Sequence, residues 1–272
     1  MSGQGLDIEL ELLIEAIYHR YSYDFRDYAR ATLMRRVQHA LVPLGCGGIS
    51  ELQGRILHSA QAFMALLQYL TVPVSGMFRD PAYFRALREH VVPLLCTYPS
   101  LRIWVAGCST GEEVYSLAIL LHEEGLLTRS LLYATDINPR ALSKARRGVY
   151  PLDSMRQWTE NYQQSGGLGS FADYYTAAYG AALIDKGLRE RVIYADHSLA
   201  TDSVFAETQL ISCRNVLIYF NRPLQDRAIG LFHESLGHRG FLGLGSRESL
   251  DFSPHGHCFE TVARPERVFR KR

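Results

Sequence analysis

The sequence predicts an α/β protein in which an all-helical N-terminal domain precedes a doubly wound parallel sheet. Apolar residues recur at three- and four-residue spacings from Leu6 to about residue 93, which is typical of helices. Short apolar runs then alternate with amphipathic segments, and the first of these runs ends in a glycine loop. A chain of 272 residues with 47% hydrophobic and 21% charged residues has the size and composition of a globular protein of one or two domains.

The first part of the chain, residues 1–93, is expected to form the helical domain. Asp80 is expected to be an N-cap because Pro81 follows it at a first helical position, and the apolar spacing extends that helix through Val91. Two earlier helices are indicated by the spacing of Leu6, Leu10, Leu13, Ile14 and Ile17, and of Leu33, Val37 and Leu41.

The second part, residues 94–272, alternates predicted strands with predicted helices. The order is strand 101–106, glycine loop 107–111, helix 112–124, strand 131–135 and helix 139–147. A strand at 209–213, a helix from about 223 to 237, and strands at 241–244, 258–263 and 268–270 follow. This order indicates a parallel sheet with right-handed crossovers.

Residues 155–195 interrupt the alternation. The segment is rich in Tyr, Ala and Gly and contains β-like stretches at 181–184 and 191–194. We interpret it as an insertion that carries a helix and a small antiparallel ribbon.

Charge and cysteine content exclude several classes of protein. The 29 Lys+Arg residues nearly balance the 28 Asp+Glu residues, so a net charge of +1 does not call for nucleic acid as the main partner. The five cysteines are dispersed and form no CxxC pair, and no fourth ligand accompanies His255, His257 and Cys258, so no metal site is expected. Acidic residues near the start and the lack of a long apolar run favour a cytoplasmic protein without membrane insertion.

The glycine loop and the acid after the second strand indicate a nucleoside-containing cofactor. Gly107 and Gly111 permit a sharp turn into a helix and close approach of a ligand, while Asp136 can accept hydrogen bonds from both ribose hydroxyls. The loop is GxxxG rather than GxGxxG, and Glu112 and Glu113 at the helix start would repel a pyrophosphate. Both details favour S-adenosylmethionine over NAD; the alternative is that the two glutamates only complement the helix dipole.

Several ordered motifs over nearly the whole chain resemble the chemotaxis receptor methyltransferases, the CheR family. They are VSGMFRD at 74–80, AGCSTGEEVYS at 106–116, ATDIN at 134–138, HSL at 197–199 and CRNVLIYF at 213–220. The resemblance implies an N-terminal helical domain that recognises receptors, a Rossmann-like class I methyltransferase domain and an inserted β-subdomain. It also implies transfer of a methyl group from S-adenosylmethionine to receptor glutamates, which gives methyl esters and S-adenosylhomocysteine.

Carried over by position, the resemblance assigns the following roles. Arg79 and Tyr219 would lie nearest the methyl transfer. Ser75 stands where the family has Thr, which keeps a hydroxyl, and Ser198 stands where the family has Asn, which loses an amide donor. The residues that would surround the cofactor are Ser75, Arg79, Gly107, Glu113, Asp136, Ser198, Leu199, Arg214 and Asn215.

The chemistry itself needs little from the protein. A glutamate side chain with an ordinary pKa near 4.3 is already ionised at neutral pH, so an in-line displacement at the sulfonium needs no general base. An arginine, Arg79 or Arg214, would orient the acceptor or the cofactor carboxylate, and Tyr219 would hold the acceptor oxygen. Because excess positive charge would lower the nucleophilicity of the acceptor carboxylate, we expect only one of these arginines to contact it.

A basic stripe of Arg26, Arg30 and Arg36 is a candidate surface for the acidic cytoplasmic helices of a chemoreceptor. The alternative is that these arginines are solvated or pair with the acidic first helix. Two other functions remain open at this point: a Rossmann-like methyltransferase for RNA or a small molecule, and a catalytically silent module that binds cofactor or docks on a receptor. The oligomeric state is not indicated.

Overall fold

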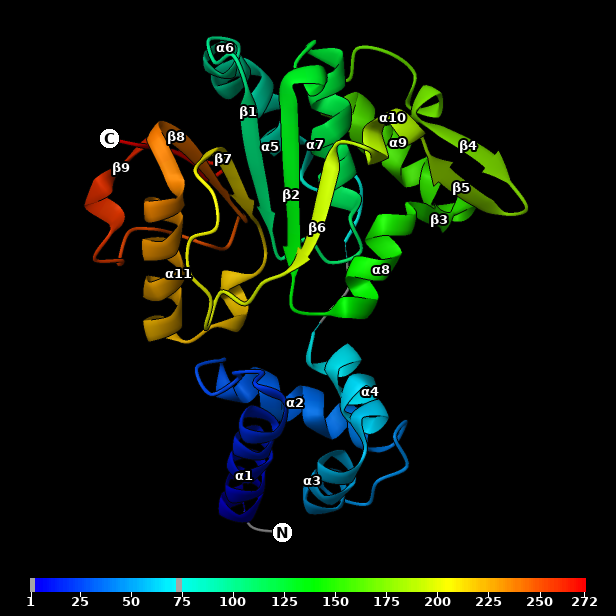
Figure 1. The fold of residues 1–272 in the computed structure, drawn as a ribbon, viewed down its shortest axis with the longest axis vertical. Coiled ribbons are helices and arrows are strands. Elements are labelled where there is room, and N and C mark those ends of the chain that lie inside the picture. Colours follow the sequence, from blue (N-terminus) through cyan, green and yellow to red (C-terminus); the bar gives the residue numbers. More distant parts are fainter. Residues whose placement is uncertain (1–2, 72–74) are drawn as a thin grey trace. The chain divides into compact units, whose positions relative to one another are not determined.

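The structure, a computed structural model, describes residues 3–71 and 75–272 and divides into two compact units (Figure 1). The first unit comprises Met1–Pro73 together with Leu199–Asp202 and Tyr219–Ala228. The second comprises Val74–Ser198, Ser203–Ile218 and Ile229–Arg272. Val74, the first residue of the VSGMFRD motif, lies outside the described residues.

Helices form the N-terminal part of the first unit, which confirms the prediction from apolar spacing. Leu10 and Leu13 are buried together with Leu33 and Val37, so the predicted stripes face the interior. The Ser59 hydroxyl caps the last helix by accepting a hydrogen bond from Ala62 N at 3.2 Å. The helices are α1 (Gly3–Tyr21), α2 (Arg30–Leu41), α3 (Ile49–His58) and α4 (Ala60–Leu70).

A later segment of the chain joins these helices within the first unit. Tyr28 and Phe220 form an antiparallel bridge, and their rings pack edge to face with centroids 4.9 Å apart. Ala29 N donates to Tyr219 O at 2.8 Å, and Asn221 N donates to Asp27 O at 2.9 Å. The first unit is therefore not one continuous stretch of sequence.

The helical stretch after residue 74 belongs to the second unit, so the predicted boundary at 93 does not coincide with the division between units. Phe84, Leu87 and Val91 share one buried cluster with Ile103 and Val105 of the first strand. The apolar spacing identified the helix correctly but could not say which core buries it. The stretch consists of α5 (Pro81–Ala86), a π-helical turn (Leu87–Val91) and α6 (Val92–Leu95).

A seven-stranded sheet forms the centre of the second unit, in the order β6-β2-β1-β7-β8-β10-β9. The first five strands pair in parallel, but β10 runs antiparallel to both β8 and β9, so the sheet is mixed rather than wholly parallel. Its strands are β1 (Leu101–Ala106), β2 (Ser130–Asp136), β6 (Val192–Asp196), β7 (Thr208–Cys213), β8 (Leu236–Leu244), β9 (Phe259–Ala263) and β10 (Val268–Lys271).

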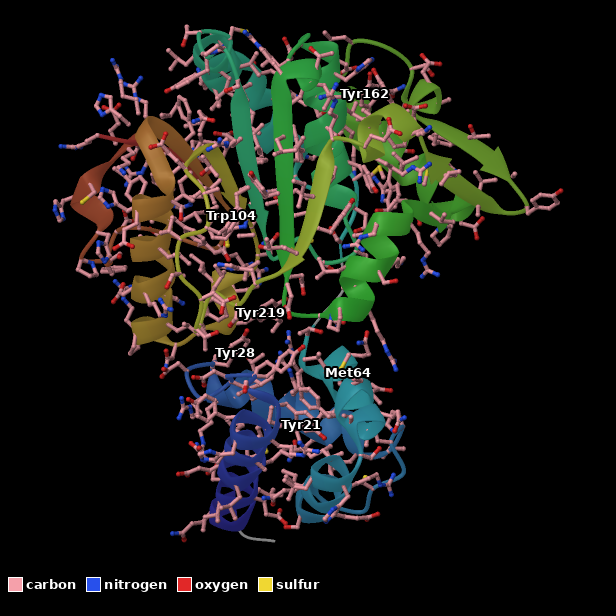
Figure 2. The ribbon with its side chains drawn as sticks, viewed as in Figure 1. Tyr21, Tyr28, Met64, Trp104, Tyr162 and Tyr219 are labelled. Atoms are coloured by element: carbon pink, nitrogen blue, oxygen red, sulfur yellow. The ribbon has the colours of Figure 1, made fainter. Side chains whose placement is uncertain are left out.

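The predicted crossover helices are present as α7 (Glu112–Glu123) and α8 (Pro139–Arg147), and α11 covers Arg222–Ser235. Gly148 ends α8 in the left-handed conformation, as the sequence predicts, with φ of 63°. Trp104 is fully buried on β1 (Figure 2) and donates to Thr135 Oγ1 on β2 at 2.9 Å, so even the polar atom of this large side chain is satisfied in the core.

The insertion forms a small three-stranded antiparallel sheet, β3-β5-β4, set apart from the large sheet in Figure 1. The strand expected at 191–194 is β6, and it belongs to the large sheet, where it pairs with β2. The third strand of the ribbon is instead formed by residues 149–151, which precede the predicted insertion. Periodicity cannot assign a short strand to its partner. The elements are β3 (Val149–Pro151), α9 (Met155–Gln164), β4 (Tyr175–Ala178), β5 (Ala181–Ile184) and α10 (Lys186–Arg189).

Candidate active site

Polar side chains gather at the carboxyl ends of four neighbouring parallel strands. Strands β6, β2, β1 and β7 are adjacent and parallel, so the loops that follow them leave the same edge of the sheet. Ligands of open α/β sheets bind at this edge. Most cofactor residues expected in the second unit lie here, namely Gly107, Glu113, Asp136, Ser198, Arg214 and Asn215.

The glycine loop is held tightly at both of its glycines. Gly107 has φ of 72°, and a Cβ there would lie 2.4 Å from the Val216 side chain. Gly111 has φ of 94°, and a Cβ there would lie 2.8 Å from Ala145 Cβ. Both positions therefore need glycine for backbone conformation and for space, as the sequence predicts.

Asp136 ends β2 beside this loop. Its two carboxylate oxygens accept hydrogen bonds from Ser109 N and Asn138 N, both at 2.8 Å. These bonds fix the carboxylate against the glycine loop and leave lone pairs on each oxygen for ribose hydroxyls. Burial raises the pKa of Asp136, and the two backbone donors act in the opposite direction.

The two glutamates at the start of α7 have different environments. Glu112 is buried, and both of its carboxylate oxygens accept from the Thr110 hydroxyl at 2.7 and 2.8 Å. Burial raises the pKa of Glu112, against hydrogen bonds from Thr110 and Ser75. Glu113 instead accepts from Ser212 Oγ at 2.6 Å and from Arg214 Nη1 at 3.0 Å. Glu113 is thus the glutamate that carries charge into the polar cluster at the end of β7.

Arg214 is the centre of that cluster. Its side chain is 1% exposed, and besides Glu113 it donates from Nη2 to Asp80 Oδ2 at 2.7 Å and to Arg79 O at 3.1 Å. The guanidinium carbon lies 4.1 Å from the centre of the Tyr83 ring, which suits a cation–π contact. A buried arginine needs such partners, because an unpaired charge in this environment would be strongly destabilising.

Asp80 occupies the N-cap position of α5 that the sequence predicts, but its side chain does not cap the helix. Its backbone is left-handed, with φ of 58°, and its side chain makes no hydrogen bond to the first turn of α5. The carboxylate pairs with the buried Arg214 instead, whose charge needs a partner. Pro81 nevertheless occupies the first helical turn as expected.

Three buried polar atoms at this edge have no hydrogen-bond partner within the described part of the chain. One is Nδ1 of the core residue His197, and the other two are Arg214 Nε in the cluster after β7 and Ser109 Oγ in the glycine loop. Buried donors are normally satisfied, so such orphans indicate a polar group that the protein binds. An amino-acid carboxylate and a ribose supply groups of this kind, and the residues present therefore fit an adenosyl amino-acid cofactor.

Other expected residues of the second unit are placed as follows. Arg79 is exposed, and its carbonyl is tied to Arg214. Ser198 follows β6, whose last residue, Asp196, is in register with Asp136 of β2. The neighbouring His197 packs its ring 5.2 Å from that of Trp104, so it is a core residue.

The remaining expected residues lie in the first unit, where Arg36 contacts Tyr219. The Arg36 guanidinium carbon lies 4.3 Å from the centre of the Tyr219 ring (Figure 2 labels Tyr219), and Arg36 also donates to Leu70 O. Arg26 pairs with Asp24 at 2.8 Å, and Arg30 lies 3.5 Å from Asp7 and 3.6 Å from Glu11 of α1. Pairing with the acidic first helix, the alternative to a free basic stripe, is thus present at Arg30. Leu199 is buried.

Sequence reasoning missed the supporting residues of the site. Tyr83 and Ser212 share a 2.8 Å hydrogen bond beside Arg214, and neither lies in a recognisable motif. Glu248 is a buried acid in the loop after β8, but its neighbours in the sequence, Arg247 and Ser249, are polar and give no sign that it is buried. Contacts across the sheet, rather than spacing along the chain, bring these side chains to the site.

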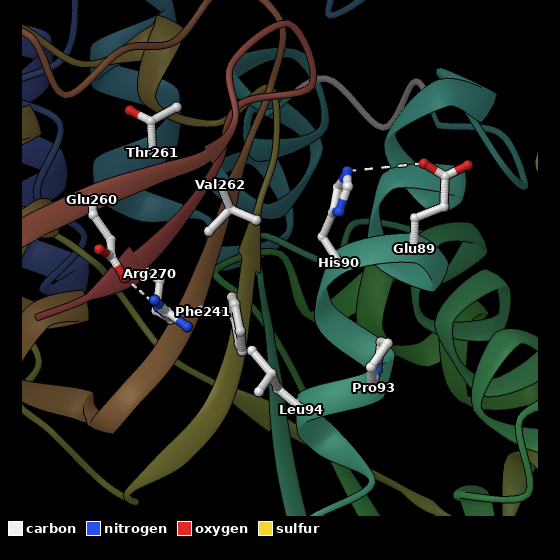
Figure 3. A pocket seen from close by; sticks show the side chains of 9 residues that line it. All are labelled: Glu89, His90, Pro93, Leu94, Phe241, Glu260, Thr261, Val262 and Arg270. Atoms are coloured by element: carbon white, nitrogen blue, oxygen red, sulfur yellow. Dashed lines mark hydrogen bonds and ion pairs between the residues drawn. The ribbon is translucent and has the colours of Figure 1, made fainter.

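A separate hollow of about 380 Å³ lies beside α6 and the strands β9 and β10 (Figure 3). Leu94, Phe241 and Val262 form its apolar floor. Its charged side chains are already in pairs, Glu260 with Arg270 and Glu89 with His90, so they do not single out an anion or a cation as a ligand. Among residues 3–71 and 75–272, no cluster of three metal-ligating side chains occurs, and no helix is long and apolar enough to cross a membrane.

Both parts of the chain match models of one protein family. Residues 8–71 match the all-alpha domain of the CheR methyltransferases, and residues 73–267 match their S-adenosylmethionine-binding domain. The chain belongs to the CheR methyltransferase family. It is therefore an S-adenosylmethionine-dependent methyltransferase, with a Rossmann-like catalytic domain after a helical domain.

Alignments with relatives from this family cover most or nearly all of the chain. A Pseudomonas putida protein named "Putative methyltransferase Cher3" is 63% identical over 99% of both chains. Proteins named chemotaxis protein methyltransferase are 30% identical in Listeria innocua, over 84% of both chains, and 28% identical in Salmonella typhimurium, over 95% of this chain and 86% of the relative. The N-methyltransferase NodS of Bradyrhizobium japonicum, solved with S-adenosylhomocysteine, aligns over 72% of this chain and 89% of its own with 15% identity and a TM-score of 0.40, which is too loose to transfer any function.

The family motifs of the second unit meet at one edge of the sheet. The segments 106–116, 134–138 and 213–218 each end or follow a strand there, so the glycine loop, Asp136 and the Glu113–Arg214 pair lie at the edge where open α/β sheets bind ligands.

Proposed function

We propose that the protein transfers the methyl group of S-adenosylmethionine to glutamate side chains of chemoreceptors, which gives glutamate methyl esters and S-adenosylhomocysteine. The observation that carries the proposal is the polar cluster at the carboxyl ends of β1, β2 and β7, in a chain whose two parts both match the family. Relatives named chemotaxis protein methyltransferase support the choice of a chemoreceptor as acceptor.

The cofactor supplies an electrophilic methyl group on a positively charged sulfur. In the proposed reaction the acceptor carboxylate forms a C–O bond as the C–S bond breaks, and the electron pair leaves with the sulfur. No proton is transferred, and two opposite charges disappear. The reaction therefore needs no general base, and we assign that role to no residue.

The chain's own residues would act by positioning. Asp136 would hold the ribose through its free lone pairs. Arg214 is already neutralised by Asp80 and Glu113, so it would hold a ligand through Nε without adding net charge at the acceptor. This leaves Arg79, which is exposed, as the arginine that would meet the acceptor. Orientation of this kind can supply several kcal/mol of the barrier reduction.

The helical domain and the inserted sheet are proposed to contact the receptor. In the first unit Arg35 of α2 is exposed, and Arg26 and Arg30 keep 40% and 49% of their side-chain surface exposed despite their ion pairs. Arg26 lies in the turn before α2, so these arginines form a partly exposed basic surface on the turn and the helix, which suits an acidic helical substrate. We place the protein in the cytoplasm, where such receptor helices lie.

The test is methyl transfer from tritium-labelled S-adenosylmethionine to a purified receptor cytoplasmic fragment. We expect label on the fragment that mild base releases as methanol, since esters of this kind are base-labile. A fragment with its methylated glutamates changed to alanine should take up no label. Label in RNA or in a small molecule, or no turnover with tight cofactor binding, would contradict the proposal.

A further inference from the structure

The loop that follows β7, residues 214–218, rests on one buried carboxylate from another part of the chain. Glu248 is 4% exposed and lies in the loop after β8. Its Oε2 accepts from Asn215 N at 3.0 Å and from Gly245 N at 2.6 Å, while its Oε1 accepts from Val216 N at 2.8 Å and from Ile218 N at 3.3 Å. Four backbone donors from two loops thus converge on one side chain.

The loop needs such support because its backbone is not relaxed. Asn215 has φ of 60°, a left-handed conformation that is uncommon outside glycine, although asparagine adopts it more readily than most residues. A Cβ on Gly245 would lie 2.7 Å from the Asn215 side-chain nitrogen and 2.8 Å from Glu248 Oε2, so the two loops approach as closely as glycine permits. A strained conformation persists only when its surroundings hold it.

The same loop begins with two residues of the cofactor site. Arg214 is buried with an unsatisfied Nε, and Asn215 follows it. Val216 also packs against the glycine loop at Gly107. A shift of the Glu248-supported backbone would therefore move both sides of the cofactor site.

We propose that Glu248 is a positioning residue for S-adenosylmethionine binding: its carboxylate holds residues 214–218 so that Arg214 and Asn215 meet the cofactor. The inference rests on the cofactor site described above. Glu248 itself touches neither the cofactor nor the acceptor, and it acts through the backbone of the loop.

A glutamine at position 248 removes the negative charge but keeps the size of the side chain, so it tests whether the charge is needed. Whichever way the amide of E248Q is turned, its NH₂ group faces two backbone N–H groups, because each Glu248 oxygen accepts two of them. Donor against donor is repulsive, and hydrogen bonds to a charged group are worth more than those to a neutral one. E248D keeps the charge but is shorter by one methylene group, so it should restore part of the support.

The experiment compares E248Q with E123Q in the full chain by calorimetric titration with S-adenosylhomocysteine. Glu123 is a second buried carboxylate that serves as the control: its side chain is 3% exposed, it accepts from Tyr174 Oη at 3.0 Å and Leu168 N at 2.9 Å, and it also accepts from Tyr162 and pairs with Arg88. It lies at the opposite end of α7 from Glu113, roughly 15 Å along the helix. Both variants should lower the melting temperature.

We expect E248Q to raise Kd for S-adenosylhomocysteine about tenfold, or about 1.4 kcal/mol, and E123Q to change it less than about twofold. E248D should fall between wild type and E248Q. In methyl transfer, KM for the methyl donor should rise more than kcat falls. Hydrogen exchange of the amides at 215, 216 and 218 should quicken in E248Q alone.

An unchanged Kd in E248Q, or equal losses of affinity in E248Q and E123Q, would overturn the inference. If E248Q does not fold, the same comparison is made with E248D, whose unaltered Kd and exchange rates would overturn it equally. Failure of the wild-type protein to bind S-adenosylhomocysteine would instead contradict the cofactor site itself. Binding without methyl transfer to a receptor fragment would contradict only the proposed acceptor.

Discussion

At Arg79 and Tyr219, single substitutions separate turnover from cofactor binding. Arg79 is exposed, and the Tyr219 ring lies against Arg36, so Tyr219→Phe keeps that contact and removes only the hydroxyl. We expect Arg79→Ala and Tyr219→Phe each to lower kcat about tenfold or more while Kd for S-adenosylhomocysteine changes less than about threefold. Single-turnover methylation of a receptor fragment and calorimetry measure the two effects, and wild-type rates would remove that residue from the mechanism.

Several residue roles were predictable from sequence because they depend on local geometry. The position of Asp136 at a strand end and the need for glycine at 107 and 111 follow from the turn into a helix. The roles of Asp80 and Arg214 did not follow, because they arise from an ion pair between positions 134 residues apart. The proline at position 81 predicted that the Asp80 side chain would cap the helix, but the carboxylate of Asp80 pairs with the buried guanidinium of Arg214 instead.

Among the elements, the start of α7 allows a sharp test of the glycine loop. Gly111 has φ of 94° and no room for a Cβ beside Ala145, whereas Gly54 lies within α3 with nothing within 4 Å of its Cβ position. Gly111→Ala should lower the free energy of unfolding by about 1–3 kcal/mol and weaken cofactor binding. Gly54→Ala should raise the free energy of unfolding by about 0.5–1 kcal/mol. Urea unfolding of both variants measures these changes. Equal changes in the free energy of unfolding would argue against backbone strain in Gly111→Ala.

Substitutions at the start of α2 and in the turn before it can show whether Arg26 and Arg30 bind the receptor or only form ion pairs within the protein. If Arg26 and Arg30 contact an acidic receptor helix, changing both to Gln should raise KM for the receptor fragment several-fold at low salt, and the effect should shrink as salt screens it. Because the pairs with Asp24 and Asp7 are exposed, the loss of stability should stay within about 1 kcal/mol.

The control is Arg55→Gln in the same assay, since Arg55 of α3 is also partly exposed and paired, with Glu51 at 3.0 Å. A KM that does not depend on salt in the double variant, with a lowered melting temperature, would show that these arginines serve only the fold.

The elements themselves were largely predictable, but their assembly was not. Strand β1 and helix α8 have the predicted bounds because their hydrophobic periods and end signals are local. The strand at 192–196 was expected in the small ribbon, and β10 was expected to be parallel, because a strand of four or five residues does not encode its partner. The helix at 81–91 was predicted, but not the core that buries it.

For the whole molecule, a net charge of +1 conceals opposed local charges. The second unit buries Glu112 and Glu248 and partly buries Asp136, and burial raises the pKa of each carboxyl. Near-neutrality of the sum therefore says nothing about the electrostatics of the site, which only the three-dimensional arrangement reveals.

The raised pKa values predict opposite pH dependences for stability and for cofactor binding. Between the ordinary pKa of a carboxyl and its raised native value, the native state binds more protons than the unfolded state, so stability falls as pH rises through that window. The pKa of Glu123 is lowered, so its contribution is lost only at pH values below the ordinary range. Asp136 must be ionised to accept from ribose, so affinity for S-adenosylhomocysteine should rise with pH over the window in which apo stability falls.

Asp136→Asn isolates this effect, because the amide does not titrate. The stability of the wild-type protein relative to Asp136→Asn, from urea unfolding without cofactor from about pH 3.5 to pH 8, should decline with rising pH by about 1.4 kcal/mol for each unit by which the pKa is raised above its ordinary value. Calorimetry over the same range should show affinity rising with pH in the wild type and a flatter profile in the variant. A relative stability that rises with pH would show instead that the bonds from Ser109 N and Asn138 N outweigh burial and lower the pKa of Asp136.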